Sequence, residues 1–165
     1  MIEQPMDHTV TTVTGDSFRL DVYRGMPLLI VNTASRDALR APQLGQLQQL
    51  YDLYAPRGFE IVAFPCNDFG EEFERDSQVS SLMIEQLKLT FPVAALSRCT
   101  GPDQSPVFRA LTSFSSDATK GPVTGNFTKF LIDVDGFAIE RFGPEVSPMD
   151  PAVREALKYA LPTSM

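Results

Sequence analysis

The chain offers little sulfur or imidazole chemistry, because its 165 residues include two cysteines, one histidine and no tryptophan. Cys66 and Cys99 form neither a CxxC motif nor a disulfide framework, and a single histidine cannot build a zinc-like cluster. That histidine, His8, stands in a polar N-terminal segment far along the chain from any nucleophile candidate. Most catalytic arrangements that pair serine or cysteine with a histidine base are therefore excluded.

Positive charge is scarce, and long apolar runs are missing. Lys and Arg number 14 against 21 Asp and Glu, which gives a formal net charge of −7. Such a balance disfavours nucleic acid and anionic membranes as partners. No run of about 18 apolar residues occurs, and the first residues, MIEQPMDHTV, lack the features of a secretory signal. We therefore expect a cytoplasmic protein with no nucleic-acid partner and no membrane partner.

Cofactor fingerprints are also missing, since no phosphate-binding glycine-rich loop, haem motif or flavin motif occurs. We expect no cofactor. The length and the 43% hydrophobic content suit one domain over residues 1–165.

Strand and helix patterns alternate along the chain. The alternating segments HTVTTVT and DSFRLDVY flank Gly15 and Asp16 and predict an N-terminal β-hairpin. Apolar runs predict buried strands, helical spacing predicts helices, and Asp135-Gly136 predicts a tight turn between two further strands. The expected strands are 27–34, 59–65, 91–96 and the pair within 127–143, and the expected helices are 39–54, 79–89, 106–114 and 151–161. This order predicts an α/β fold, with a mixed sheet flanked by helices on both faces.

One segment raises the question of chemistry. In LLIVNTASRDALRAPQ, residues 28–43, a buried strand leads directly into a small-residue turn and a helix. Many α/β enzymes hold a nucleophile at such a turn, but this one offers only Ser35 and Asp37.

Four segments carry a resemblance to a known family. LLIVNTAS, GFEIVAFPCNDFG, NFTKFLIDVDG and ERFGP closely resemble the glutathione peroxidase family, a branch of the thioredoxin-like fold, and the likeness covers nearly the whole chain. The resemblance implies a thioredoxin-like fold and a peroxidase that reduces hydroperoxides with glutathione or thioredoxin. It also implies a cysteine or selenocysteine nucleophile, assisted by a glutamine, a tryptophan and an asparagine.

Three of these four family positions carry other residues. Asp37 stands where the resemblance places the nucleophile, Glu72 replaces the glutamine, Gly125 replaces the tryptophan, and only Asn126 is retained. Asp68 replaces a second glutamine, and no resolving cysteine lies between residues 68 and 90. A carboxylate cannot pass through the sulfenic or selenenic acid of the peroxidase cycle. We therefore predict a catalytically degenerate member, retained as a noncatalytic binding or regulatory module in an oxidative-stress context.

The two cysteines leave an alternative open, which is weak thiol-dependent hydroperoxide reduction through Cys99 or Cys66. Cys66 ends a buried strand near acidic residues, so we expect a structural thiol whose pKa is raised by burial and negative charge. Cys99 lies in a loop with glycine and proline. We expect it to be exposed and oxidisable, but without an activating base.

Asp37 itself has several possible roles. It can accept backbone amides as a helix cap, which contributes about 1 kcal/mol. Together with Asp68 and Glu72 it could hold Ca²⁺ or Mg²⁺, although the spacing matches no metal motif. Asp37 and Glu72 could also act as the acid and base of a hydrolase. Finally, the short loop at 112–125 resembles that of monomeric family members, so we expect a monomer.

Overall fold

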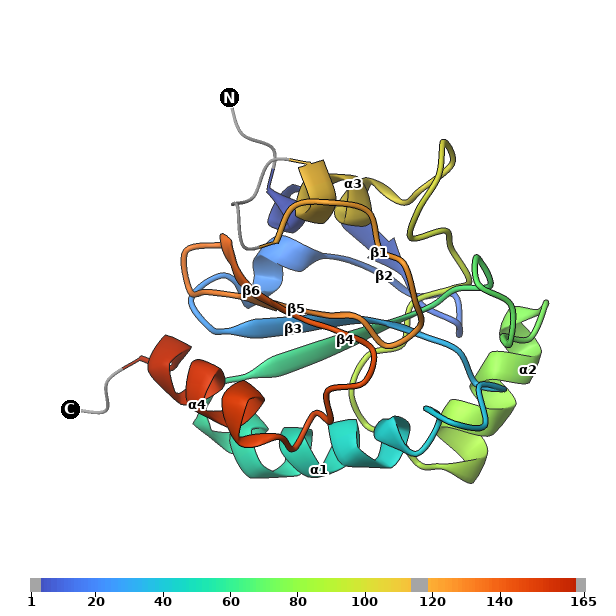
Figure 1. Cartoon of the computed structure of the whole chain (residues 1–165), viewed down its shortest axis with the longest axis horizontal. Coiled ribbons are helices and arrows are strands. Elements are labelled where there is room, and N and C mark those ends of the chain that lie inside the picture. Colours follow the sequence, from blue (N-terminus) through green and yellow to red (C-terminus); the bar gives the residue numbers. More distant parts are fainter. Residues whose placement is uncertain (1–3, 114–118, 163–165) are drawn as a thin grey trace.

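The structure is a computed structural model that describes residues 4–113 and 119–162. Within these residues, a four-stranded sheet lies between helices (Figure 1), with strand order β4-β3-β5-β6. β3 pairs parallel with β4 and antiparallel with β5, and β5 pairs antiparallel with β6. The strands are β3 (Leu28–Thr33), β4 (Glu60–Pro65), β5 (Lys129–Ile132) and β6 (Ala138–Phe142). The α/β prediction with a mixed sheet is confirmed.

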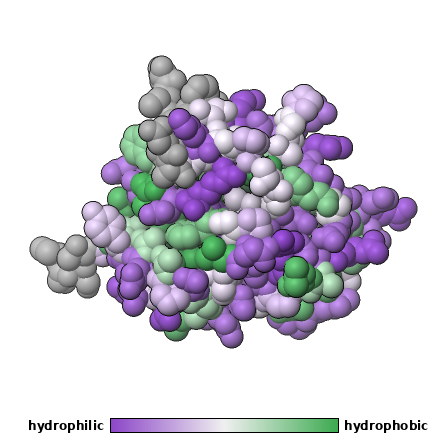
Figure 2. Space-filling model, in the orientation of Figure 1, coloured by the Kyte–Doolittle hydropathy of each residue, from purple (hydrophilic) through white to green (hydrophobic). Residues whose placement is uncertain are grey.

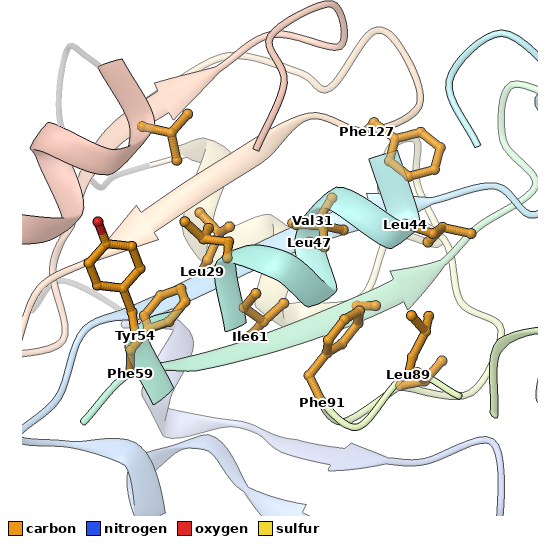
Figure 3. Packing of buried hydrophobic residues seen from close by; sticks show 14 of the residues in the cluster. Leu29, Val31, Leu44, Leu47, Tyr54, Phe59, Ile61, Leu89, Phe91 and Phe127 are labelled. Atoms are coloured by element: carbon orange, nitrogen blue, oxygen red, sulfur yellow. The ribbon is translucent and has the colours of Figure 1, made fainter. Parts of the chain in front are cut away.

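Both faces of β3 are buried, as its unbroken apolar run predicts. Leu29 and Val31 pack toward helices α1 (Gln43–Tyr54) and α4 (Pro151–Ala160), and Figure 3 shows Leu47 of α1 beside Val31. The opposite face of the sheet packs against helix α3 (Pro106–Ser113), which lies across the sheet from α1 and α4 in Figure 1. The period of two in a strand therefore divides the core into two clusters.

The N-terminal hairpin consists of β1 (Thr9–Thr11) and β2 (Ser17–Arg19), paired antiparallel as expected. Gly15 adopts a φ of 94° in the connecting turn, a conformation that favours glycine. The end of the second predicted strand is instead a 3-10 helix, Leu20–Tyr23. Its Leu20 is fully buried in the cluster beneath α3.

Two element boundaries differ from the prediction. Helix α1 begins at Gln43 rather than near Leu39, whose side chain is 76% exposed, because residues 37–42 form a hydrogen-bonded turn. The expected strand at 91–96 forms only two isolated bridges, Thr12 to Ala94 and Ala63 to Val93. Pro92 within it has no N–H to donate to a longer ladder.

The expected helix at 79–89 begins earlier and ends earlier. It consists of α2 (Asp76–Ser80) followed by a wider π-helical turn, Ser81–Gln86. Lys88 has a φ of 58°, a conformation that does not continue a helix.

The outside of the molecule is mostly polar. Figure 2 shows a face dominated by hydrophilic residues, with hydrophobic patches between them. Exposed large apolar side chains come from separate elements; they are Val22, Leu39, Leu53, Leu87, Phe137 and Tyr159. Among the described residues, no helix has the length and apolarity needed to cross a membrane.

Candidate functional site

Asp37 lies in the turn that follows β3, and its side chain is buried. The backbone N–H of Arg40 donates to Oδ1 at 3.1 Å. On Oδ2, the carboxylate accepts from the Arg40 guanidinium at 3.3 Å and from the Asn126 amide at 3.4 Å. The predicted role as an acceptor of backbone amides is therefore confirmed, but Asp37 caps the turn ahead of α1 rather than α1 itself.

These donors keep the carboxylate charged. Burial alone would raise the pKa of Asp37, but the Arg40 amide, the Asn126 amide and the Arg40 guanidinium together outweigh it and lower the pKa below its ordinary value. Asp37 is therefore an anion at neutral pH. A group in this state is a poor general acid.

Arg40 continues the network to the loop after β6, where it pairs with Glu145. Beside this pair, Lys129 of β5 is completely buried, and its Nζ donates to the carbonyl oxygens of Gly143 and Val146. Burial lowers the pKa of Lys129 to about 7, partly opposed by Glu145. Arg40, Lys129 and Glu145 are not among the site residues predicted from the sequence. A signal for Lys129 was present, since it is the only charged residue in β5.

Glu72 is also buried, and it connects the loop after β4 to the turn after β3. Its Oε2 accepts the N–H of Ser35 at 3.0 Å, and its Oε1 accepts the N–H of Phe73 at 2.7 Å. Burial raises the pKa of Glu72, and these two amides only partly offset the effect. Glu72 therefore reaches the Asp37 turn through the backbone of Ser35. The structure gives no direct contact between the two carboxylates to support the acid-base pair of a hydrolase.

Gly125 and Asn126 precede β5. The carbonyl oxygen of Gly125 accepts from the side chain of Asn32 at 3.1 Å, which ties the segment to β3. A Cβ at Gly125 would lie 3.0 Å from Cγ of Pro144, so a tryptophan there requires Pro144 to move. Asn126 donates to Asp37, while its own buried Oδ1 has no hydrogen-bond partner among the residues that the structure describes.

The structure does not bring together Asp37, Asp68 and Glu72, the oxygen-donor set considered as a possible metal site. Among the described residues, the cluster of three potential ligands consists of Cys66, Asp68 and Cys99, and Asp37 and Glu72 are not part of it. Asp68 instead turns toward the loop before α3, where its Oδ2 accepts the N–H of Cys99 at 2.7 Å. Asp37, Asp68 and Glu72 therefore accept hydrogen bonds from different segments and do not share one site.

The two thiols lie together. The Sγ atoms of Cys66 and Cys99 are 2.8 Å apart, and both residues are completely buried. The expected exposure of Cys99 is wrong, because the backbone N–H of Cys99 donates to Asp68 and this hydrogen bond holds the loop against the core. The expected rise in the pKa of Cys66 is also wrong, since the hydrogen bond from the Cys99 thiol lowers it more than burial raises it. The same contact raises the pKa of Cys99.

A polar hollow of about 580 Å³ borders Glu72. Its lining carries both signs of charge and consists of Arg36, Asn67, Glu71, Glu72, Phe73, Glu74, Arg75 and Gln78. Asp37 does not contribute to it. The opening therefore lies on the Glu72 side of the site, and a small polar ligand is the kind that it could accept.

Residues 6–112 match the sequence profile of the family described as Glutathione peroxidase. The chain belongs to the glutathione peroxidase family. A phospholipid hydroperoxide glutathione peroxidase from Arabidopsis thaliana chloroplasts is 37% identical over 143 residues, which cover 86% of this chain and 61% of that protein. The chain thus spans less than two thirds of the length of this relative.

Solved structures agree with the assignment. The crystal structure of T. cruzi GPX1 matches with a TM-score of 0.68 and 30% identity, covering 97% of this chain and 95% of that one. A thioredoxin-family thiol:disulfide interchange protein from Chlorobium tepidum matches with a TM-score of 0.74, 21% identity and 98% coverage of both chains, a likeness in fold alone. The predicted thioredoxin-like fold is confirmed, and so is the predicted membership of the glutathione peroxidase family.

Proposed function

We propose that this family member does not reduce hydroperoxides at the Asp37 position, and that it is retained as a noncatalytic binding or regulatory module in an oxidative-stress context. One observation carries the proposal. Asp37 holds the position that the family resemblance assigns to the nucleophile, and its carboxylate is buried and bound by Arg40 and Asn126.

The chemistry of the family reaction supports this proposal. A thiolate or selenolate attacks one peroxide oxygen, supplies two electrons and becomes a sulfenic or selenenic acid. A carboxylate has no corresponding oxidation step. The two hydrogen bonds that Glu72 accepts also bind it to the backbone, where it supports the turn.

A peroxidase assay tests the proposal directly. Consumption of hydrogen peroxide and of cumene hydroperoxide would be followed with glutathione or thioredoxin as the reductant. We expect no turnover by the wild type and a gain of turnover by Asp37→Cys. The matched control is Ser35→Cys, which places a thiol two residues earlier in the same turn and should stay inactive.

A second candidate function rests on the thiol contact of 2.8 Å. In this case the chain is a weak thiol-dependent hydroperoxide reductase that uses Cys66 or Cys99. Cys66→Ser and Cys99→Ser decide between the two candidates. Wild-type turnover that disappears in either variant overturns the noncatalytic proposal and identifies the reacting thiol.

A further inference from the structure

Two cysteines that are far apart in the sequence meet in the core on the α3 face of the sheet. Cys66 directly follows β4, and Cys99 lies in the loop that leads to α3. Both belong to the buried cluster that also contains Val62, Phe64 and Phe108. We propose that Cys66 and Cys99 form a reversible intramolecular disulfide, a redox modification site separate from the Asp37 position.

The distance between the sulfurs favours a disulfide. The Sγ atoms are 2.8 Å apart, and a disulfide bond is about 2.05 Å long. Bond formation therefore requires only a small movement of the two side chains. Thiolates that share a tetrahedral zinc ion at bonds of about 2.3 Å lie about 3.8 Å apart, so the observed spacing is short for a metal site.

Asp68 holds the loop that carries Cys99 in place beside Cys66. Its Oδ2 accepts the backbone N–H groups of Cys99 at 2.7 Å and Thr100 at 3.2 Å, and its Oδ1 accepts from the Arg98 guanidinium at 3.2 Å. Asp68 lies two residues after Cys66, so these hydrogen bonds hold the Cys99 loop close to the end of β4. Asp68 therefore positions the backbone of Cys99 so that its thiol lies against that of Cys66.

A hollow beside the thiols gives a route for a small oxidant. It has a volume of about 330 Å³ and is lined by Asn67 and Asp68, next to Cys66, and by Ser97 and Arg98, next to Cys99. The sulfurs themselves are buried, so a hydroperoxide needs only a local opening of this wall to reach them.

The reaction consumes one hydroperoxide for each disulfide. The Cys66 thiolate attacks one peroxide oxygen, the O–O bond breaks, and the alkoxide leaves as the alcohol after protonation. The resulting Cys66 sulfenic acid is attacked by Cys99, the S–O bond breaks, and the oxygen leaves as water. The two sulfurs lose two electrons in total. An external thiol returns them through thiol-disulfide exchange only when the buried bond is opened, which is too slow to sustain the turnover that the peroxidase assay measures.

The site does not depend on the proposed function. Disulfide formation can be stoichiometric and needs no turnover, so it stands whether or not Asp37 is catalytically silent. The disulfide would link the end of β4 to the loop before α3, and it would thereby restrict the wall of the adjoining hollow.

The test uses the wild-type protein. The reduced protein would be treated with an equimolar amount of hydrogen peroxide or tert-butyl hydroperoxide, denatured, alkylated and analysed by mass spectrometry. We expect loss of both alkylation sites, a mass lower by two hydrogens, a cross-linked peptide pair containing Cys66 and Cys99, and reversal by dithiothreitol. The oxidised protein should also melt on the order of 5–10 °C higher than the reduced protein.

The single variants Cys66→Ser and Cys99→Ser serve as matched controls and should not form the intramolecular bond. Two thiols that remain alkylatable after peroxide overturn the proposal, and so does an exclusively intermolecular disulfide. Zinc chloride is the remaining probe. If it raises the melting temperature of the reduced protein and protects both thiols, the pair is a metal site and the disulfide proposal fails. Peroxide turnover, measured separately, tests only the noncatalytic proposal.

Discussion

Asp37 joins two parts of the fold through one carboxylate. It binds the turn before α1 through the Arg40 amide, and it binds the segment before β5 through Asn126. Charged groups make stronger hydrogen bonds than neutral ones, and a buried donor that loses its acceptor is costly. The residue at the family's nucleophile position therefore stabilises this chain whatever its catalytic role.

Replacement of Asp37 by alanine should lower the free energy of unfolding by about 1–3 kcal/mol, because the Arg40 amide and the Asn126 amide lose their acceptor. Urea unfolding followed by circular dichroism measures the change. The control is Asp103→Ala at an exposed loop position, where we expect a change within about 0.5 kcal/mol. Equal stability of the two variants would show that the Asp37 contacts contribute nothing.

Helix α4 shows how a single residue can define an element. Asp150 precedes the helix, its Oδ1 accepts the N–H of Ala152 at 2.9 Å, and Pro151 occupies the first turn. Val153, Leu157 and Leu161 then bury one face of the helix, as their spacing predicts. The cap fixes where the helix begins, and the apolar spacing fixes which face is buried.

Replacement of Asp150 by alanine should destabilise the protein by about 1 kcal/mol, since the N–H of Ala152 loses its side-chain acceptor. The expected decrease in melting temperature is about 2–4 °C, which calorimetry can resolve. Asp150→Ser keeps an acceptor oxygen and should recover most of the loss. A serine variant as unstable as the alanine variant would assign the effect to charge rather than to capping.

Burial of Lys129 couples one side chain to the stability of the whole molecule. Its folded pKa of about 7 lies below the ordinary value of 10.5. Between these pH values the unfolded chain holds the proton and the folded protein has released it, so the free energy of unfolding contributed by Lys129 rises with pH. Below about pH 7 both states are protonated, and the contribution is constant at its lowest value.

The unfolding free energy of the wild type minus that of Lys129→Met should therefore increase as the pH rises from about 7 toward 10.5. Denaturant unfolding at several pH values from 6 to about 9.5 measures this difference, because groups common to both proteins cancel. Parallel stability curves over this range would contradict a neutral, buried Lys129.

Oligomeric state and location are also properties of the whole molecule, and both stay predictions. The expected monomer rests on the loop at 112–125, and residues 114–118 of that loop lie outside the described residues. The exposed apolar side chains come from separate elements, which suits a monomer. The expected cytoplasmic location depends on the sequence alone.

Local patterns were enough to predict most of the fold. The apolar run of β3, the Asp135-Gly136 turn and the Asp150-Pro151 cap each depend on neighbouring residues, and the structure confirms all three. The start of α1 was predicted too early, because residues 37–42 form a separate hydrogen-bonded turn that apolar spacing alone does not distinguish from the first turn of the helix.

The sequence by itself determined the sheet, the helices and the residue types at the family positions, since periodicity and motifs are local properties. Only the tertiary structure decided which groups meet. It placed Cys99 in the core against Cys66, because Asp68 binds the Cys99 backbone, and it buried Lys129 beside the Asp37 network. Contacts between distant segments have no signature in local spacing, and burial changes the pKa of a group only after the chain has folded around it.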